Sequence, residues 1–310
     1  MNHMINFNLL RIGKIQPAIA LLLTWSLFNV TAVASDSDRD RSSFDADWRF
    51  TMGDPANVGD ELSYTNIKQW VMANGNQFIK DGQSTTRPSG NLGDAVTYTQ
   101  TGFDDSGWQH VSLPHDWAIA GPFKQEYSGS TGKLKFWGVG WYRKHFNVAA
   151  SDQGRRIVLA VDGAMSYANV WVNGQYVGGW PYGYASWQLD LTPCIKYGGE
   201  NVVAIRLDNP PDSSRWYPGG GIYRHVWLIK TGPIHVGQWG TYVTTPDIKS
   251  SEATVKIQVT VDNSADSNAD VSVENEIYEL KQNGAKVGPV AFAGAYQVEV
   301  AAHSNQISQS

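Results

Sequence analysis

The residues that decide the fold of this chain are 212–228, which read DSSRWYPGGGIYRHVWL. Three consecutive glycines, Gly219 to Gly221, predict a tight corner, because glycine adopts backbone angles closed to other residues. Before the corner, Arg215 offers a planar fork of N–H donors, and Trp216 and Tyr217 offer flat apolar faces with polar edges. An arginine beside two aromatic rings suits a sugar, which has C–H faces to cover and hydroxyls to hydrogen-bond. The same residues also fit a packed corner of a β domain, since buried aromatics usually form core.

Outward from this corner, residues 35–232 are predicted to form one β domain, with strand patterns from Phe44 onward. The pair Asn173 and Gly174 is the strongest short signal for a hairpin turn. No segment shows a long, sustained helical period. Many short strands at this spacing predict an all-β domain, either a sandwich or a jelly roll. The clearest predicted strands are 157–161, 167–172, 175–177, 201–207 and 222–229.

The segment 53–101 is rich in Gly, Asn, Asp and Thr and interrupts this pattern. We interpret it as an insertion on the surface, with one short helix or strand around residues 67–72. Loops often carry function, but the composition of this one favours a tolerated surface addition.

Residues 233–310 carry a second β pattern. Alternating apolar residues at 254–261 and again at 271–277 have the period of two that is typical of half-buried strands. These segments predict an immunoglobulin-like β-sandwich. The region is shorter than the about 100 residues of that fold, and residues 303–310 are not predicted to form a closing strand. We therefore expect this second sandwich to be incomplete.

Five motifs, taken together, resemble glycoside hydrolase family two, which includes β-galactosidases, β-glucuronidases and β-mannosidases. The resemblance runs from about Phe44 to the end of the chain, and the form LPHDW is most similar to the β-galactosidase branch. It implies a sugar-binding jelly-roll domain, then an immunoglobulin-like domain, and then a catalytic barrel. The motifs are FDDSGW at 103–108, LPHDW at 113–117, GWYRK at 140–144, VWVNG at 170–174 and RWYPGGGIYRHVWL at 215–228.

The resemblance implies that the catalytic residues lie outside this chain. Glycoside hydrolysis needs two carboxyl groups that flank the scissile bond, and in the family they stand on the barrel, which takes about 250 residues. We therefore predict no catalytic residue in this chain and no activity from it alone. The pair Asn275 and Glu276 resembles the Asn-Glu pair before the family's acid/base, but it falls on a strand predicted to be exposed, and we interpret it as a coincidence. The seven histidines lack metal-binding spacing, so we predict neither a metal site nor a cofactor.

Two residues are predicted to contact substrate. By resemblance, Arg215 stands where the first domain of the family reaches the sugar; the alternative is a salt bridge to Asp212 or Asp208. Asp116, in the LPHDW motif, lies beside the same edge. Its carboxylate would either accept a hydrogen bond from a sugar hydroxyl or cap the turn that follows Pro114.

The remaining tryptophans are predicted mainly to pack. Trp180 begins a loop that reads WPYGY, residues 180–184, which would suit an exposed aromatic platform, although its position in the family favours packing. Core positions are predicted for Trp117, Trp141, Trp171 and Trp227.

The N-terminus predicts export. Residues 1–34 read as a signal peptide, with Arg11 and Lys14 before an apolar run at 18–30. The run is too short for a comfortable membrane span. It ends in the A-x-A pattern of residues 32–34, so the mature chain is expected to begin near Ser35, in the periplasm or outside the cell, without a membrane anchor.

Composition limits the partners. A net charge of −5 argues against nucleic acid as a ligand. The single cysteine, Cys194, excludes an intrachain disulfide, so stability must come from the core. The partners we expect are a carbohydrate, a β-galactoside or a related sugar, and the catalytic barrel; assembly into a homo-oligomer stays open. Three hypotheses remain: the N-terminal part of an exported β-galactosidase-like hydrolase, a stand-alone carbohydrate-binding module, and a structural β-sandwich.

Overall fold

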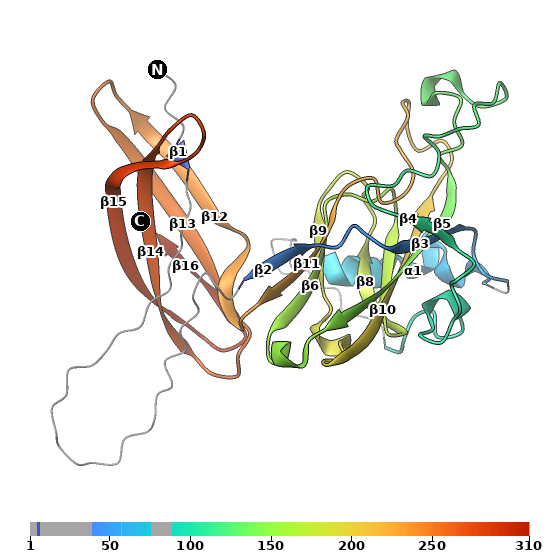
Figure 1. The fold of residues 1–310 in the computed structure, drawn as a ribbon, viewed down its shortest axis with the longest axis horizontal. Coiled ribbons are helices and arrows are strands. Elements are labelled where there is room, and N and C mark those ends of the chain that lie inside the picture. Colours follow the sequence, from blue (N-terminus) through green and yellow to red (C-terminus); the bar gives the residue numbers. More distant parts are fainter. Residues whose placement is uncertain (1–4, 7–38, 57, 76–88, 310) are drawn as a thin grey trace, which may run out of the picture. The chain divides into compact units, whose positions relative to one another are not determined.

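The computed structural model describes residues 5–6, 39–56, 58–75 and 89–309. They divide into two compact units, one of residues 41–230 and one of residues 231–310 together with the described residues before Arg41. Strands dominate both units, so the predicted all-β class is confirmed (Figure 1). The predicted signal peptide, 1–34, lies outside the described residues except for Ile5 and Asn6. No helix in the described ranges has both the length and the apolar character needed to cross a membrane.

The larger unit is a sandwich of two antiparallel sheets. One sheet has the strand order β4-β3-β5-β10-β7-β8, and the other has the order β2-β11-β6-β9. In the first sheet the strands are β3 (Trp48–Met52), β4 (Gln109–Val111), β5 (Gly138–Val148), β7 (Ala168–Val172), β8 (Gln175–Trp180) and β10 (Gly199–Asn209). In the second they are β2 (Asp40–Ser43), β6 (Arg156–Val161), β9 (Trp187–Asp190) and β11 (Val226–Thr231).

The core between these sheets follows from the alternation along their strands. Tyr142 on β5, Ile205 on β10 and Trp187 on β9 are buried on the facing sides of the two sheets. A fully buried side chain of this kind contributes roughly 1.5–3 kcal/mol. The hairpin predicted at Asn173 and Gly174 joins β7 to β8, and both residues have positive φ, 53° and 80°, as a two-residue hairpin turn requires.

The described residues of the segment 53–101, which are 53–56, 58–75 and 89–101, include side chains that pack on the other face of the six-stranded sheet, which corrects the interpretation of the segment as a surface addition. The segment contains the 3-10 helices η2 (Asp60–Leu62) and η4 (Thr97–Thr99) and the helix α1 (Tyr64–Gly75), which overlaps the helix considered for 67–72. The residues that it buries pack on side chains of β5, β7, β8 and β10 that point away from the sandwich core. The members of this second core are Leu62, Ile67, Val71, Val96, Trp141, Trp171, Tyr176 and Ala204.

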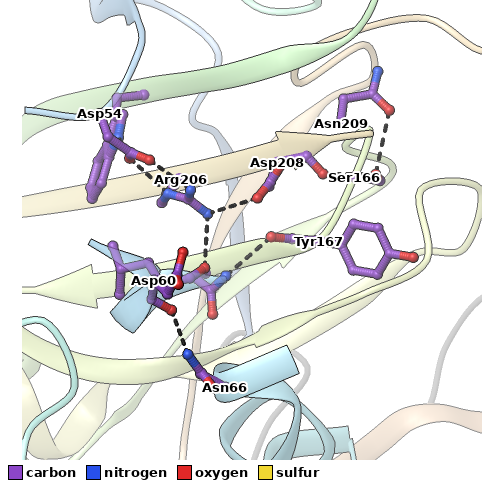
Figure 2. A network of polar contacts seen from close by, with 11 residues as sticks. Asp54, Asp60, Asn66, Ser166, Tyr167, Arg206, Asp208 and Asn209 are labelled. Carbon is purple, nitrogen blue, oxygen red and sulfur yellow. Dashed lines mark hydrogen bonds and ion pairs between the residues drawn. The ribbon is translucent and has the colours of Figure 1, made fainter. Parts of the chain in front are cut away.

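A buried ion pair joins the start of this segment to the sheet. Figure 2 shows Arg206 of β10 between Asp54 and Asp208. Its Nη2 and Nε donate to the two carboxylate oxygens of Asp54 at 2.7 and 2.8 Å, and its Nη1 donates to the carbonyl oxygen of Leu62 at 3.2 Å. Burial raises the pKa of the Asp54 carboxyl, but the hydrogen bonds and charge of Arg206, with a hydrogen bond from Trp141, outweigh it and leave that pKa below its ordinary value.

The smaller unit consists of two three-stranded sheets, with the orders β12-β13-β16 and β1-β14-β15. Its core includes Val259, Val261, Val273 and Val300. The strands are β1 (Ile5–Asn6), β12 (Ile234–Ile248), β13 (Ala253–Asn263), β14 (Ala269–Leu280), β15 (Lys286–Val300) and β16 (Ser304–Gln309).

The prediction that residues 303–310 form no closing strand is wrong. β16 pairs with β13 in a continuous antiparallel register, from Gln258 opposite Gln309 to Asn263 opposite Ser304. Its sequence SNQISQ shows no apolar alternation, so only the pairing with β13 could have revealed it. Asn275 on β14, in the other sheet, is also buried rather than exposed as expected, since it lies on the same face of the strand as the core residue Val273.

Candidate functional site

The glycine corner is the centre of the candidate site, and close packing requires two of its glycines. A Cβ on Gly220 would lie 2.7 Å from ring atoms of Trp117, and one on Gly221 would lie 2.4 Å from the hydroxyl of Tyr142. Gly221 also has a φ of 109°, which side chains rarely allow. The corner is therefore fixed in place and is not a flexible hinge.

The LPHDW motif lies alongside this corner. The backbone N–H of His115 donates to the carbonyl oxygen of Ile222 at 2.8 Å, and that of Trp117 donates to the carbonyl oxygen of Gly220 at 3.0 Å. Two motifs that are about 100 residues apart in the sequence thus run side by side, as the resemblance implied.

Asn209 closes the loop 210–218 at its base. Its buried Nδ2 donates to the carbonyl oxygen of Gly219 at 2.8 Å and to that of Phe136 at 2.9 Å. Ser166 donates to its Oδ1 at 3.4 Å, a contact that Figure 2 also shows. Because the side-chain amide of Asn209 joins the two ends of the loop, the positions of both ends are fixed.

Asp116 makes the turn-capping contact that the sequence suggested. Its Oδ1 accepts the backbone N–H of Ala118 at 3.0 Å. The hydroxyl of Tyr217 is 2.8 Å from both carboxylate oxygens. Burial raises the pKa of Tyr217, and the hydrogen bond and the charge of Asp116 raise it further, so the phenol remains a donor to Asp116. Asp116 is half-buried and already has partners, and a sugar hydroxyl would have to add to them.

Arg215 is exposed, and the structure shows neither of the salt bridges considered for it. Asp208 pairs with Arg206 instead, at 3.4 Å. Within the described ranges no side chain accepts a hydrogen bond from Arg215, so its guanidinium is available to a ligand. The structure does not bring Arg215 into contact with Asp116; the link between their segments is Tyr217, two residues after Arg215.

The predicted core tryptophans divide into two groups. Trp141 and Trp171 are fully buried, stacked with ring centroids 5.4 Å apart, whereas Trp117 and Trp227 are partly buried. Trp180 is also partly buried and packs against the sandwich core, which agrees with the expectation of packing.

Sequence reasoning considered Trp216 and the loop 180–184 separately and did not bring together the three exposed rings near Arg215. Tyr182, Tyr184 and Trp216 are 59%, 41% and 57% exposed. The signal in the sequence was Pro181 before the first tyrosine and Gly183 between the two, since both residue types are typical of a surface loop. In composition alone, however, an aromatic residue on a loop looks the same as an aromatic residue in a core.

The site offers hydrogen bonds and aromatic faces, which are the contacts of sugar recognition. A guanidinium, a carboxylate and three exposed rings lie on loops that a rigid sandwich supports. Across the residues that the structure describes, no group of three or more His, Cys, Asp or Glu side chains is placed to hold a metal ion.

Comparison with known proteins identifies relatives of this chain. A family model described as the second all-beta domain of beta-galactosidase matches residues 103–213. Beta-galactosidase BoGH2A of Bacteroides ovatus is 41% identical over 247 residues, which are 79% of this chain and 24% of that protein. The chain belongs to glycoside hydrolase family two. A putative beta-glucuronidase of Formosa agariphila is 33% identical over 172 residues, which are 55% of this chain and 16% of that protein.

Solved structures of the family share the fold. A family-two glycosyl hydrolase from Bacteroides cellulosilyticus has a TM-score of 0.67 and 29% identity, and the match covers 87% of this chain and 30% of that chain. A beta-glucuronidase of family two has the same TM-score, 0.67, at 20% identity over 90% of this chain and 27% of its own. Among the curated relatives, this chain spans about a quarter or less of the length of beta-galactosidase BoGH2A and of the putative beta-glucuronidase.

Proposed function

We propose that this chain is the N-terminal, non-catalytic part of an exported β-galactosidase-like glycoside hydrolase, and that its glycine corner presents Arg215 and Asp116 to the sugar. The observation that carries the proposal is the exposed Arg215 guanidinium, which has no partner in the described ranges and stands on a loop with a rigid base. In this proposal the bond is cleaved by two carboxyl groups of the barrel that the family supplies.

The chemistry of the loop supports sugar binding. A guanidinium holds its charge at any working pH and donates several N–H bonds in one plane, which fits the closely spaced hydroxyls of a pyranose. Asp116 has acceptor capacity beyond the bonds from Ala118 and Tyr217. The Tyr217 contact sets the direction of the carboxylate, so a sugar would meet a group that is already oriented.

One observation favours a second specificity, for β-glucuronides. Four of the relatives similar to this chain are named beta-glucuronidase or putative beta-glucuronidase. An unpaired arginine is the side chain that best binds a carboxylate, through two parallel hydrogen bonds. If Arg215 meets the carboxylate of a glucuronide, its loss should affect that substrate far more than a galactoside.

The test is the substitution Arg215→Ala in a protein that includes the catalytic barrel. Loss of a hydrogen bond to a charged group costs about 1.5–3 kcal/mol, so kcat/KM should fall roughly ten- to a hundredfold, with the melting temperature unchanged. Arg215→Lys should recover only part, because lysine lacks the fork. Arg156→Ala on β6, which breaks an exposed pair with Asp190, is the matched control.

Both nitrophenyl β-galactoside and nitrophenyl β-glucuronide should be assayed. An equal fall on both substrates supports contact with hydroxyls that the two sugars share, and a selective fall on the glucuronide supports the second specificity. Wild-type kcat/KM on both, in a correctly folded variant, would remove Arg215 from the sugar site.

A further inference from the structure

Two loops of the larger unit bring three exposed aromatic side chains together. Tyr182 and Tyr184 lie on the loop between β8 and β9, and Trp216 lies on the loop after β10. The indole N–H of Trp216 donates to the hydroxyl of Tyr184 at 2.9 Å, and the ring centroids of Tyr182 and Tyr184 are 5.7 Å apart. We refer to Tyr182, Tyr184 and Trp216 as the aromatic shelf.

Both loops of the shelf contact one short segment, residues 163–167. The backbone N–H of Tyr167 donates to the carbonyl oxygen of Pro181 at 3.1 Å, which fixes the first loop. Met165 exchanges two backbone hydrogen bonds with Gly221, of 2.9 and 3.2 Å, which fixes the second. A Cβ on Gly183 would lie 2.3 Å from the sulfur of Met165, so the first loop lies tightly against the same segment.

A fourth ring reinforces this support. Tyr223, just after the glycine corner, donates from its hydroxyl to the carbonyl oxygen of Gly183 at 2.9 Å. Its ring centroid is 6.5 Å from that of Tyr184. The two loops are therefore tied to each other directly as well as through residues 163–167. Because the rings are held before any ligand arrives, a ligand would bind at a low cost in conformational entropy.

The composition of the shelf points to a neutral, polyhydroxylated ligand. All three side chains are uncharged, and each has an apolar face and a polar edge. A pyranose has the complementary surface, with C–H groups on its faces and hydroxyls on its rim. Arg215 precedes Trp216 and is exposed, so hydroxyls beyond the rings would meet a charged donor. A nucleic acid would instead need a basic surface, and the net charge of this chain is −5.

We propose that the aromatic shelf binds an oligosaccharide, with pyranose units stacked on Trp216 and the two tyrosines. The ligand class, a β-galactoside chain, rests on the proposed function, but the binding itself requires no hydrolysis. Under this proposal the chain holds sugar units beyond the one that meets Arg215 and Asp116. Longer substrates should consequently bind more tightly than a single sugar.

The test uses the 310-residue chain and isothermal titration with β-linked galacto-oligosaccharides of one to four units. Affinity should rise with length, and Trp216→Ala and Tyr184→Ala should each weaken binding of the longest ligand by at least about tenfold. Tyr184→Phe keeps the ring and should stay within about threefold of the wild type. Trp239→Ala, which removes an exposed tryptophan of the smaller unit, is the matched control and should bind like the wild type.

The outcomes separate the proposals. If the folded wild-type chain binds no oligosaccharide, or if Trp216→Ala binds like the wild type, the shelf is not a glycan site. If the chain binds no glycan but Trp216→Ala destabilises a protein that includes the barrel, the shelf is an interface with another domain, and the proposal is overturned. Should Trp216→Ala not fold, Tyr182→Ala alters the shelf without breaking the Trp216–Tyr184 bond and must show the same loss. If Arg215→Ala hydrolyses substrate like the wild type while glycan binding is intact, the proposed role of Arg215 is rejected and the proposal for the aromatic shelf is retained.

Discussion

Removing Asp54 should reveal how strongly the segment 53–101 is attached to the sheet. The side chain of Arg206 is 4% exposed, and both of its strongest hydrogen bonds go to Asp54. In Asp54→Asn the guanidinium keeps its contacts with Leu62 and Asp208, at 3.2 and 3.4 Å. Breaking a buried ion pair from one side costs about 3–5 kcal/mol. We expect a loss of about 3 kcal/mol, at the low end of that range, because the Asp54 side chain is 23% exposed and Asp208 remains.

This loss should lower the melting temperature by roughly 6–12 °C, at about 2–4 °C per kcal/mol for a unit of this size. Thermal unfolding followed by tryptophan fluorescence suits the measurement, since Trp141 donates a hydrogen bond to Asp54. The control is Arg156→Ala. The partner of Arg156 is Asp190, which is 39% exposed, so loss of this ion pair should lower the free energy of unfolding by less than about 1 kcal/mol. A double variant, Asp54→Leu with Arg206→Met, removes both charges and should recover part of the stability.

The pH dependence gives a second check on the same pair. Asp54 has a lowered pKa in the folded chain, so its contribution is present above the unfolded value of about 3.9 and is lost as the pH falls toward the folded value. The gap in unfolding free energy between wild type and Asp54→Asn should therefore be constant from about pH 7 to 5 and shrink below about pH 4. A gap under about 1 kcal/mol at pH 7, the value of an exposed pair, would refute the reasoning.

Three other predictions follow from particular residues. Gly221→Ala should cost several kcal/mol, because its Cβ would overlap the Tyr142 hydroxyl at a φ of 109°, whereas Gly59→Ala, with no atom within 4 Å, should be nearly neutral; urea unfolding compares the two. Ile67→Ala should destabilise the chain by about 2–5 kcal/mol in the same assay, and a cost below about 0.5 kcal/mol would show that α1 is a dispensable surface element. N-terminal sequencing of protein from a secreting host should begin near Ser35, and a mature chain that retains the apolar run would overturn the signal peptide.

Local patterns predicted those parts of the fold whose information is local. The hairpin between β7 and β8 was readable because Asn173 and Gly174 tolerate positive φ and are flanked by alternating residues. The glycine corner was readable because three glycines in succession have few other uses. The resemblance located the LPHDW motif beside that corner, and the backbone bonds of His115 and Trp117 place it there.

The parts that the sequence did not reveal depend on tertiary neighbours. β16 has a polar sequence and becomes a strand only because β13 offers a free edge. Trp216 lies beside Tyr184, 32 residues earlier in the chain, and donates a hydrogen bond to it, a contact between two loops that no local pattern predicts. Asp208 pairs with Arg206 of the same strand and not with Arg215, and the sequence alone left both partners open. The spacing of residues in the sequence does not reveal any of these three contacts.

The stacked pair of Trp141 and Trp171 has a consequence for how this domain tolerates change in length. The two indoles lie under α1 and its neighbours, with Trp171 also donating to the carbonyl oxygen of Leu92 at 2.7 Å. If residues 53–101 were shortened to a tight turn, two of the largest apolar side chains would face water on an open sheet, a patch that invites self-association. The six-stranded sheet is therefore the middle of three layers, with the four-stranded sheet on one face and α1 and its neighbours on the other. Homologous proteins without the helix should therefore have smaller or polar residues at the positions of both tryptophans, and a graft of this segment onto such a protein should succeed only if the pair is transferred with it.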